Sequence, residues 1–162
     1  MLPFVRNPHR TLIGKARRAM KGRAQTTVSC ELQLRLVVSS GSSVPVPAEL
    51  RYETSDPYAV HATFHTGESE SVDWVFARDL LADGLRHAAG AGDVRVWPIR
   101  RRGQDLVCIA LSSPEGHALL EAPARMLQSF LDRTNAVVRP GTEHRYFDID
   151  VELAQLLADR TD

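Results

Sequence analysis

The sequence predicts an α+β fold in which two antiparallel sheets pack face to face with helices at one end. Short segments that alternate apolar and polar residues fill most of the first half of the chain. Turn residues separate these segments, and leucines at helical spacing occur near residue 80 and again beyond residue 124. A period of two buries one face of a strand, whereas spacings of three and four bury one side of a helix. The resulting order is four strands, a helix, three or four strands, and then helices.

Four strands are expected before the first helix. The first covers residues 26–39, where valine, cysteine and leucine alternate with polar residues. The next residues, 41–47, are expected to form a loop, because Pro45 and Pro47 cannot donate hydrogen bonds inside a sheet. Turn-forming residues then separate three shorter strands. These strands are expected at residues 48–52, 58–64 and 72–76.

The middle of the chain predicts a short helix and a second group of strands. Residues 77–87 place Leu80, Leu81 and Leu85 on one side of a helix. The run Arg100-Arg101-Arg102-Gly103-Gln104 is expected to form the turn at the tip of a hairpin. Strands are expected on both sides of that turn and once more after it, at residues 93–99, 105–111 and 117–122.

Two helices are expected toward the C-terminus. Pro123 suits the first turn of a helix, where its missing N–H is not needed. This helix runs to about residue 135 and buries Leu127, Phe130 and Leu131. Asp148 or Asp150 is expected to cap the last helix. That helix carries a narrow apolar stripe made of Leu153, Leu156 and Leu157.

The composition is that of a globular protein with an uneven charge distribution. The 162 residues are 43% hydrophobic and 25% charged, and the formal net charge is zero. Residues 1–24 hold seven of the twenty basic residues and no acidic one, which leaves the remainder with 13 basic and 20 acidic residues and a formal charge of −7. No linker divides the remainder. We therefore expect a basic arm over residues 1–25 and a single domain over residues 26–162.

The basic arm allows three interpretations. Leu12, Ile13, Ala16 and Met20 fall near one side of a helix among Arg and Lys, which weakly resembles a surface-seeking amphipathic helix. The arm could instead be disordered and solubilising, or translation could begin at Met20. No apolar run reaches the length of a membrane span, and the N-terminus lacks the apolar core of a secretion signal, so a cytoplasmic protein is expected.

No constellation of residues points to catalysis, to a cofactor or to a metal. His61 and His65 share one face of a strand, but four strand steps separate them by about 13 Å, too far to chelate one ion. Cys30 and Cys108 lie in apolar runs and are expected to be buried, reduced thiols. Ser112 and Ser113 lack the nucleophile-elbow motif and are expected to lie at a turn. We expect no catalytic, cofactor-binding or metal-binding residues and no enzyme activity.

A surface that binds single-stranded nucleic acid needs exposed aromatic rings beside basic residues. Tyr58, Phe64, Trp74 and Phe76 fall on the inward phase of their strands, where bases cannot stack on them. Trp97 is out of phase with its neighbours and is expected to be exposed or at a subunit interface. Since the body is acidic, nucleic-acid binding is not expected. The arginines of residues 100–102 form either a solvated turn or a docking point for an acidic partner.

The amino-acid sequences of several segments resemble those of a known family. These segments are TTVSCELQLRLVVSS, DPYAVHATFHTG, VDWVFARDLL, GDVRVWP, VCIALSSPEGHALLEAPA and RTNAVVRPGTEHRYFDID. In their order and spacing they resemble the SsgA-like family of sporulation-specific cell-division proteins of filamentous actinobacteria, and most closely its SsgB branch. The resemblance runs from about residue 26 to about residue 158. It implies a whirly-like fold of two four-stranded sheets, assembled as a homotrimer.

The resemblance also implies a function. Proteins of the SsgB branch position the tubulin-like GTPase FtsZ at future septa, promote its polymerisation and help to tether the ring at the membrane. A related SsgA-type protein takes part in their placement. The implied protein is a non-catalytic scaffold at the division septum whose partners are FtsZ, an SsgA-type protein and its own copies, with peripheral membrane association through partners or the arm. The alternative is a single-stranded nucleic-acid-binding protein of the same fold. The residues that contact partners are not identified by the resemblance.

Overall fold

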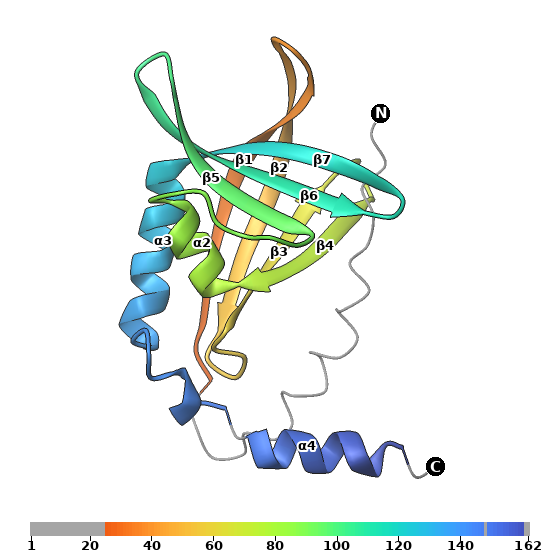
Figure 1. The fold of residues 1–162 in the computed structure, drawn as a ribbon, viewed down its shortest axis with the longest axis vertical. Coiled ribbons are helices and arrows are strands. Elements are labelled where there is room, and N and C mark those ends of the chain that lie inside the picture. Colours follow the sequence, from red (N-terminus) through yellow and green to blue (C-terminus); the bar gives the residue numbers. More distant parts are fainter. Residues whose placement is uncertain (1–24, 148, 161–162) are drawn as a thin grey trace.

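The computed structural model describes residues 25–147 and 149–160 (Figure 1). Residues 1–24, which make up almost all of the predicted arm, and the candidate cap Asp148 lie outside the described residues, as does the side chain of Asp150. Within the described residues the structure is mostly antiparallel sheet with a few helices, which agrees with the predicted α+β class.

Seven antiparallel strands of the described residues form one sheet in the order β4-β3-β2-β1-β7-β6-β5. The strands are β1 (Thr27–Ser39), β2 (Ser42–Glu53), β3 (Ala59–His65), β4 (Ser71–Ala77), β5 (Val94–Arg101), β6 (Gln104–Ser113) and β7 (Gly116–Pro123). Each of the seven strands expected from alternation is present, several of them with longer bounds.

The expected pair of four-stranded sheets is wrong: residues 25–147 form one curled sheet of seven strands. The reason is the length of β1, whose 13 residues pair with β2 over most of their length and with β7 near the end of the strand. The second contact joins Arg35 to Glu121 and Leu36 to Leu120. One strand thus belongs to both halves, and strand twist folds the halves over a shared core (Figure 1).

The expected loop at residues 41–47 is also wrong, since β2 begins at Ser42 and includes both prolines. Pro45 and Pro47 lie opposite Arg35 and Gln33 of β1. On its other side, β2 pairs with β3 only through residues 48–51. Because Pro45 and Pro47 are two residues apart, their backbone nitrogens face the same side of β2. They face away from β1, toward the side of β3, and β3 does not extend as far as these two residues. The missing N–H groups therefore interrupt no ladder, as in an edge strand.

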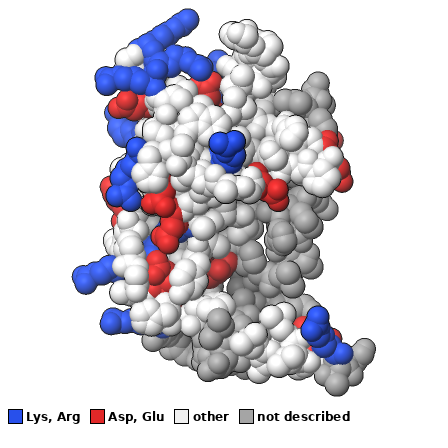
Figure 2. Space-filling view, viewed as in Figure 1, with Lys and Arg blue, Asp and Glu red and all other residues white. Residues whose placement is uncertain are grey.

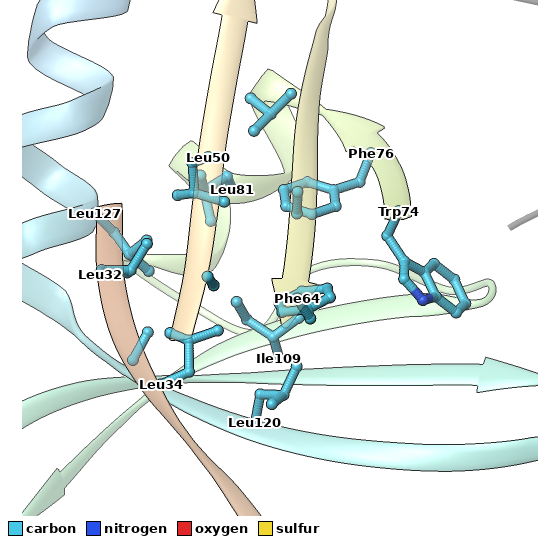
Figure 3. Packing of buried hydrophobic residues seen from close by; sticks show 14 of the residues in the cluster. Leu32, Leu34, Leu50, Phe64, Trp74, Phe76, Leu81, Ile109, Leu120 and Leu127 are labelled. Atoms are coloured by element: carbon cyan, nitrogen blue, oxygen red, sulfur yellow. The ribbon is translucent and has the colours of Figure 1, made fainter. Parts of the chain in front are cut away.

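The core lies between the two halves of the sheet. Figure 3 shows Leu34, Phe64 and Ile109, which come from β1, β3 and β6, within one cluster of buried side chains. Leu127 reaches the same cluster from the helix α3 (Ala124–Val137). Burying one such side chain contributes about 1.5–3 kcal/mol, so this cluster is the main source of stability.

Two helices cover one side of the sheet (Figure 1). The helix α2 (Arg78–Gly84) is shorter than the expected residues 77–87. Leu81 is fully buried, while Leu80 in the helix and Leu85 just after it pack on the core with part of their surface exposed. In α3 the predicted side is confirmed, because its buried residues include Leu127, Phe130 and Leu131. A short 3-10 turn, η2 (Glu143–Arg145), follows.

The last helix, α4 (Ile149–Ala158), confirms the predicted helix near the C-terminus. It lies below the sheet in Figure 1, apart from α2 and α3. Its apolar stripe is not buried in the core: Leu153 is 51% exposed, Leu156 is 50% exposed and Leu157 is 64% exposed. The stripe therefore contributes little to the stability of the sheet domain.

Candidate partner-binding surfaces

The arginine run at residues 100–102 lies at the tip of the β5–β6 hairpin, as the sequence predicts. The loop has two residues, Arg102 and Gly103, between the paired residues Arg101 and Gln104. Both loop residues have positive φ, 52° and 75°, as the tight type I′ turn requires. Such a turn matches the twist of the two strands, so the hairpin holds its arginines at a defined place on the surface.

The three arginines differ in how far their charge is neutralised. Arg101 donates from one nitrogen to both carboxylate oxygens of the buried Glu121, at 2.7 and 2.8 Å. Arg100 lies 3.8 Å from Asp105, and both side chains are exposed, so this pair is weak. Arg102 has no ion-pair partner among the described residues. Figure 2 shows Lys and Arg gathered at the upper left, where Figure 1 places this tip.

A second charged cluster is buried at the opposite end of α3. Arg78, which is 2% exposed, donates to the backbone oxygens of Thr134 and Val138 at 3.2 and 2.8 Å. It also donates to the Glu143 carboxylate at 2.8 Å, and its guanidinium lies 4.9 Å from the centre of the Tyr52 ring. These bonds satisfy carbonyls at the end of a helix, where a cation is favoured. The cluster joins the start of α2 to the end of α3 and to η2.

The electrostatics of this cluster favour its charged form. Burial of the Glu143 carboxyl opposes ionisation, but hydrogen bonds from backbone amides and from Arg78 outweigh burial and lower the pKa of Glu143. Burial raises the pKa of Tyr52, whose hydroxyl donates to the Pro57 carbonyl at 2.9 Å. Neither Arg78 nor Glu143 has a buried polar atom left without a partner. The cluster therefore holds the fold together and offers no free group to a ligand.

The histidines and serines that could have formed a metal or catalytic site have structural partners or lie far from one another. His61 lies 3.1 Å from the Asp56 carboxylate, and His65 is exposed at the end of β3. Ser112 is bonded across the hairpin to His117 at 3.1 Å, and Ser113 accepts from the Glu115 amide at 3.2 Å. Among the described residues no group of three or more His, Cys, Asp or Glu could hold a metal ion.

The cysteines are free thiols on strands that are not neighbours, since β7 separates β1 from β6. Cys108 is buried as expected, and burial raises the pKa of its thiol. Cys30 is only half-buried, so the expectation of full burial is wrong for this residue. A raised pKa leaves less thiolate, the nucleophilic form, at neutral pH.

The aromatic residues are distributed largely as the alternation predicts. Phe64, Trp74 and Phe76 are buried. The prediction that Tyr58 points inward is wrong, because its side chain is 49% exposed and lies just before β3. Its ring meets that of Phe147 edge-on, with 6.2 Å between the ring centroids. Trp97, expected to be exposed or at a subunit interface, is half-buried next to the buried Val96. The buried rings are not available for stacking on bases.

Comparison with known proteins identifies the family. A family model described as the Streptomyces sporulation and cell division protein SsgA matches residues 46–143. The chain belongs to this family. Within the SsgA family, the curated protein named sporulation-specific cell division protein SsgB from Streptomyces coelicolor is 74% identical over 134 residues, which cover 83% of this chain and 98% of that protein. SsgB from Thermobifida fusca is 45% identical over 82% of this chain and 96% of its own length.

Two solved structures of the SsgA family have the same fold. One, reported for mutations in SsgB that correlate to longitudinal cell division during sporulation of Streptomyces coelicolor, is 74% identical with a TM-score of 0.76 and covers 78% of this chain and 99% of its own. The other, an SsgA-like sporulation-specific cell division protein from Thermobifida fusca, is 44% identical with a TM-score of 0.75. It covers 83% of this chain and 98% of its own. These findings confirm the resemblance to the SsgB branch.

The names of these relatives support a role in sporulation cell division, and they describe cell-division proteins rather than enzymes. No helix among the described residues is long and apolar enough to cross a bilayer.

Proposed function

We propose that this protein recruits FtsZ to future septum sites during sporulation, promotes its polymerisation and helps to tether the ring. The observation that carries the proposal is the 74% identity to SsgB of Streptomyces coelicolor over 98% of that protein's length. The fold of the solved SsgB structure extends over 78% of this chain, so the surfaces presented to partners have the same framework. The protein then acts by binding and positioning rather than by catalysis.

The proposal includes an assembly and a location. Three copies in a homotrimer present one weak surface three times, which raises avidity for a filament without strong single contacts. The protein works in the cytoplasm at the division septum, together with an SsgA-type protein of the same family. Contact with the membrane is peripheral, through partners or the basic arm.

The alternative, single-stranded nucleic-acid binding, has less support. It needs exposed rings beside basic groups. Phe64, Trp74 and Phe76 are instead part of the core, and the body outside residues 1–24 carries a formal charge of −7. The arm would have to supply the attraction to phosphates by itself.

Co-sedimentation tests the proposal. FtsZ from the same organism is polymerised with GTP, with and without the full-length protein, and both proteins are quantified in the pellet. We expect the protein in the pellet and more FtsZ polymer in its presence. An unchanged amount of polymer with the protein left in the supernatant would refute the proposal. Anisotropy with a labelled oligonucleotide at two salt concentrations covers the alternative, for which tight, steeply salt-dependent binding is the signal.

A further inference from the structure

We propose that a groove between the β5–β6 hairpin and the first turn of α3 binds an extended, acidic peptide segment that carries apolar side chains. The inference deepens the proposed function, since it names a surface and a partner chemistry for a recruiting protein. It rests on that function for its biological role, whereas the binding itself depends on the residues of the groove.

The lining of the groove is mixed, and its apolar side chains, which we call the floor, are incompletely covered. Leu85, Ile99 and Leu106 belong to the floor; they come from the residue after α2, from β5 and from β6, and each of the three is only half-buried. Pro123 and Ala124 continue the apolar surface at the start of α3. The groove has a volume of about 680 Å³, which is within the range of pockets that hold small-molecule ligands. An apolar side chain placed on this floor would remove further apolar surface from water, at about 25 cal/mol per Å².

One arginine lines the rim of the groove, and two more lie next to its lining residues. Arg125 lines it from the first turn of α3, is exposed, and has no ion-pair partner among the described residues. Arg102 lies in the hairpin loop next to Gly103, which lines the groove. Asp105 is the one carboxylate among the described lining residues, and Arg100 lies 3.8 Å from it. Arg125 in the lining and Arg102 beside it, both without a described ion-pair partner, thus lie near the apolar side chains of the floor.

The helix end adds to this charge. The first turn of α3 contains no acidic residue, and no side chain of the described residues caps it. Its free N–H groups and the helix dipole favour an anion at that end of the helix. The chain outside residues 1–24 carries a formal charge of −7, which opposes an acidic partner in general, and the arginines and the helix end offset that charge locally. Charge complementarity therefore favours an acidic segment at this groove.

A peptide fits the groove better than a nucleic acid does. A nucleic acid offers phosphates and flat bases, but the described residues that line the groove include no aromatic residue on which a base could stack. A peptide supplies carboxylates for the arginines and alkyl side chains for the floor. An extended segment also places alternate side chains on opposite faces, so that apolar residues meet the floor while acidic ones reach the rim.

The test uses short synthetic peptides with a fluorescent label, in which Asp or Glu flanks Leu, Ile or Phe at varied positions. Three variants of the full-length protein are compared with the wild type by fluorescence polarisation. The double variant Arg102→Glu/Arg125→Glu reverses the rim, and Ile99→Gln makes the floor polar. Arg139→Glu is the matched control, because it reverses an exposed arginine just beyond the other end of α3.

We expect the wild type to bind acidic peptides with apolar residues more tightly than versions with Gln for each acid or Ser for each apolar residue. The rim variant should lose at least about tenfold in affinity, equivalent to about 1.4 kcal/mol, and Arg139→Glu should change it less than about twofold. The floor variant should lose affinity for peptides with apolar residues and not for those with Ser.

Three results would overturn the inference: no preference for acidic over neutral peptides, unchanged binding by the rim variant, or an equal loss with Arg139→Glu. The FtsZ co-sedimentation assay separates this inference from the proposed function. If the wild type binds the peptides through the groove and yet leaves FtsZ polymer unchanged, the proposed function fails while the groove stands. If the wild type pellets with FtsZ and no acidic peptide binds, the groove fails while the proposed function stands.

Discussion

At the scale of single residues, the buried Arg78 predicts the largest loss of stability. Arg78→Met leaves the Glu143 carboxylate buried without its cation and removes the donor that serves the Thr134 and Val138 carbonyls. Breaking a buried pair in this way costs about 3–5 kcal/mol. We therefore expect the midpoint of urea unfolding to fall steeply. Arg86→Met is the matched control, since Arg86 is exposed and lies 3.5 Å from Asp83, and it should change stability by less than about 1 kcal/mol. Equal midpoints for the two variants would contradict the assignment.

The lowered pKa of Glu143 predicts a dependence of stability on pH. A carboxyl whose pKa is lower in the folded state stabilises the protein above its unfolded pKa, near 4.5, and loses that contribution as the pH falls through the folded pKa. Glu143→Gln should therefore be less stable than the wild type at pH 7. The difference should shrink when urea unfolding is measured near pH 3. A difference that stays constant or grows on acidification would show that Glu143 is not ionised in the folded protein.

The sequence predicts positions that depend on local spacing and misses those that depend on distant contacts. Phe64 and Trp74 are predicted correctly because alternation alone determines which face of a strand a residue occupies. Tyr58 is misplaced because the pattern does not reveal that the strand begins one residue later. The burial and ion pair of Arg78 could not be predicted, because its partner Glu143 is 65 residues away in the sequence. A single arginine after a strand has no local pattern that distinguishes it from an exposed one.

At the scale of elements, Gly84 fixes how closely α2 approaches β5. A Cβ at this position would overlap Cγ1 of Val96, which is fully buried and cannot move aside. Alanine favours a helix more than glycine does, by about 1 kcal/mol, but overpacking costs about 1–3 kcal/mol. Gly84→Ala should therefore lower the thermal unfolding midpoint. Gly92→Ala, which meets nothing within 4 Å, should leave it almost unchanged. A rise in the midpoint for Gly84→Ala would contradict this packing.

The pairing of strands is the part of the fold that the sequence could not predict. Each strand was expected from alternation, but alternation does not say which strands are neighbours. The short contact of β1 with β7, at Arg35 and Leu36, decides between one curled sheet and two separate ones. The hairpin with its arginines was predicted because its two strands are adjacent in sequence. The groove beside it was not, because its lining residues come from the residue after α2, from both hairpin strands and their loop, from the end of β7 and from α3.

At the scale of the whole molecule, the sheet of the described residues is open. β4 and β5 are its two edges, and each has one neighbouring strand in the described part of the chain, apart from a single bridge between Ala89 and Val96. An open edge carries unpaired N–H and C=O groups, which proteins commonly cover by assembly or by other segments. The open sheet is therefore compatible with the homotrimer that the proposed function includes.

The homotrimer predicts a definite mass in solution. Light scattering coupled to size exclusion should give about three times the 18.0 kDa of one chain. If avidity underlies the proposed effect on FtsZ, co-sedimentation should be lost when the protein is diluted below the concentration at which the trimer dissociates. The amount of protein in the pellet should then fall more steeply with dilution than it would for independent binding of single copies. Monomeric mass at every concentration, together with undiminished co-sedimentation, would show that a single copy suffices and that avidity plays no part.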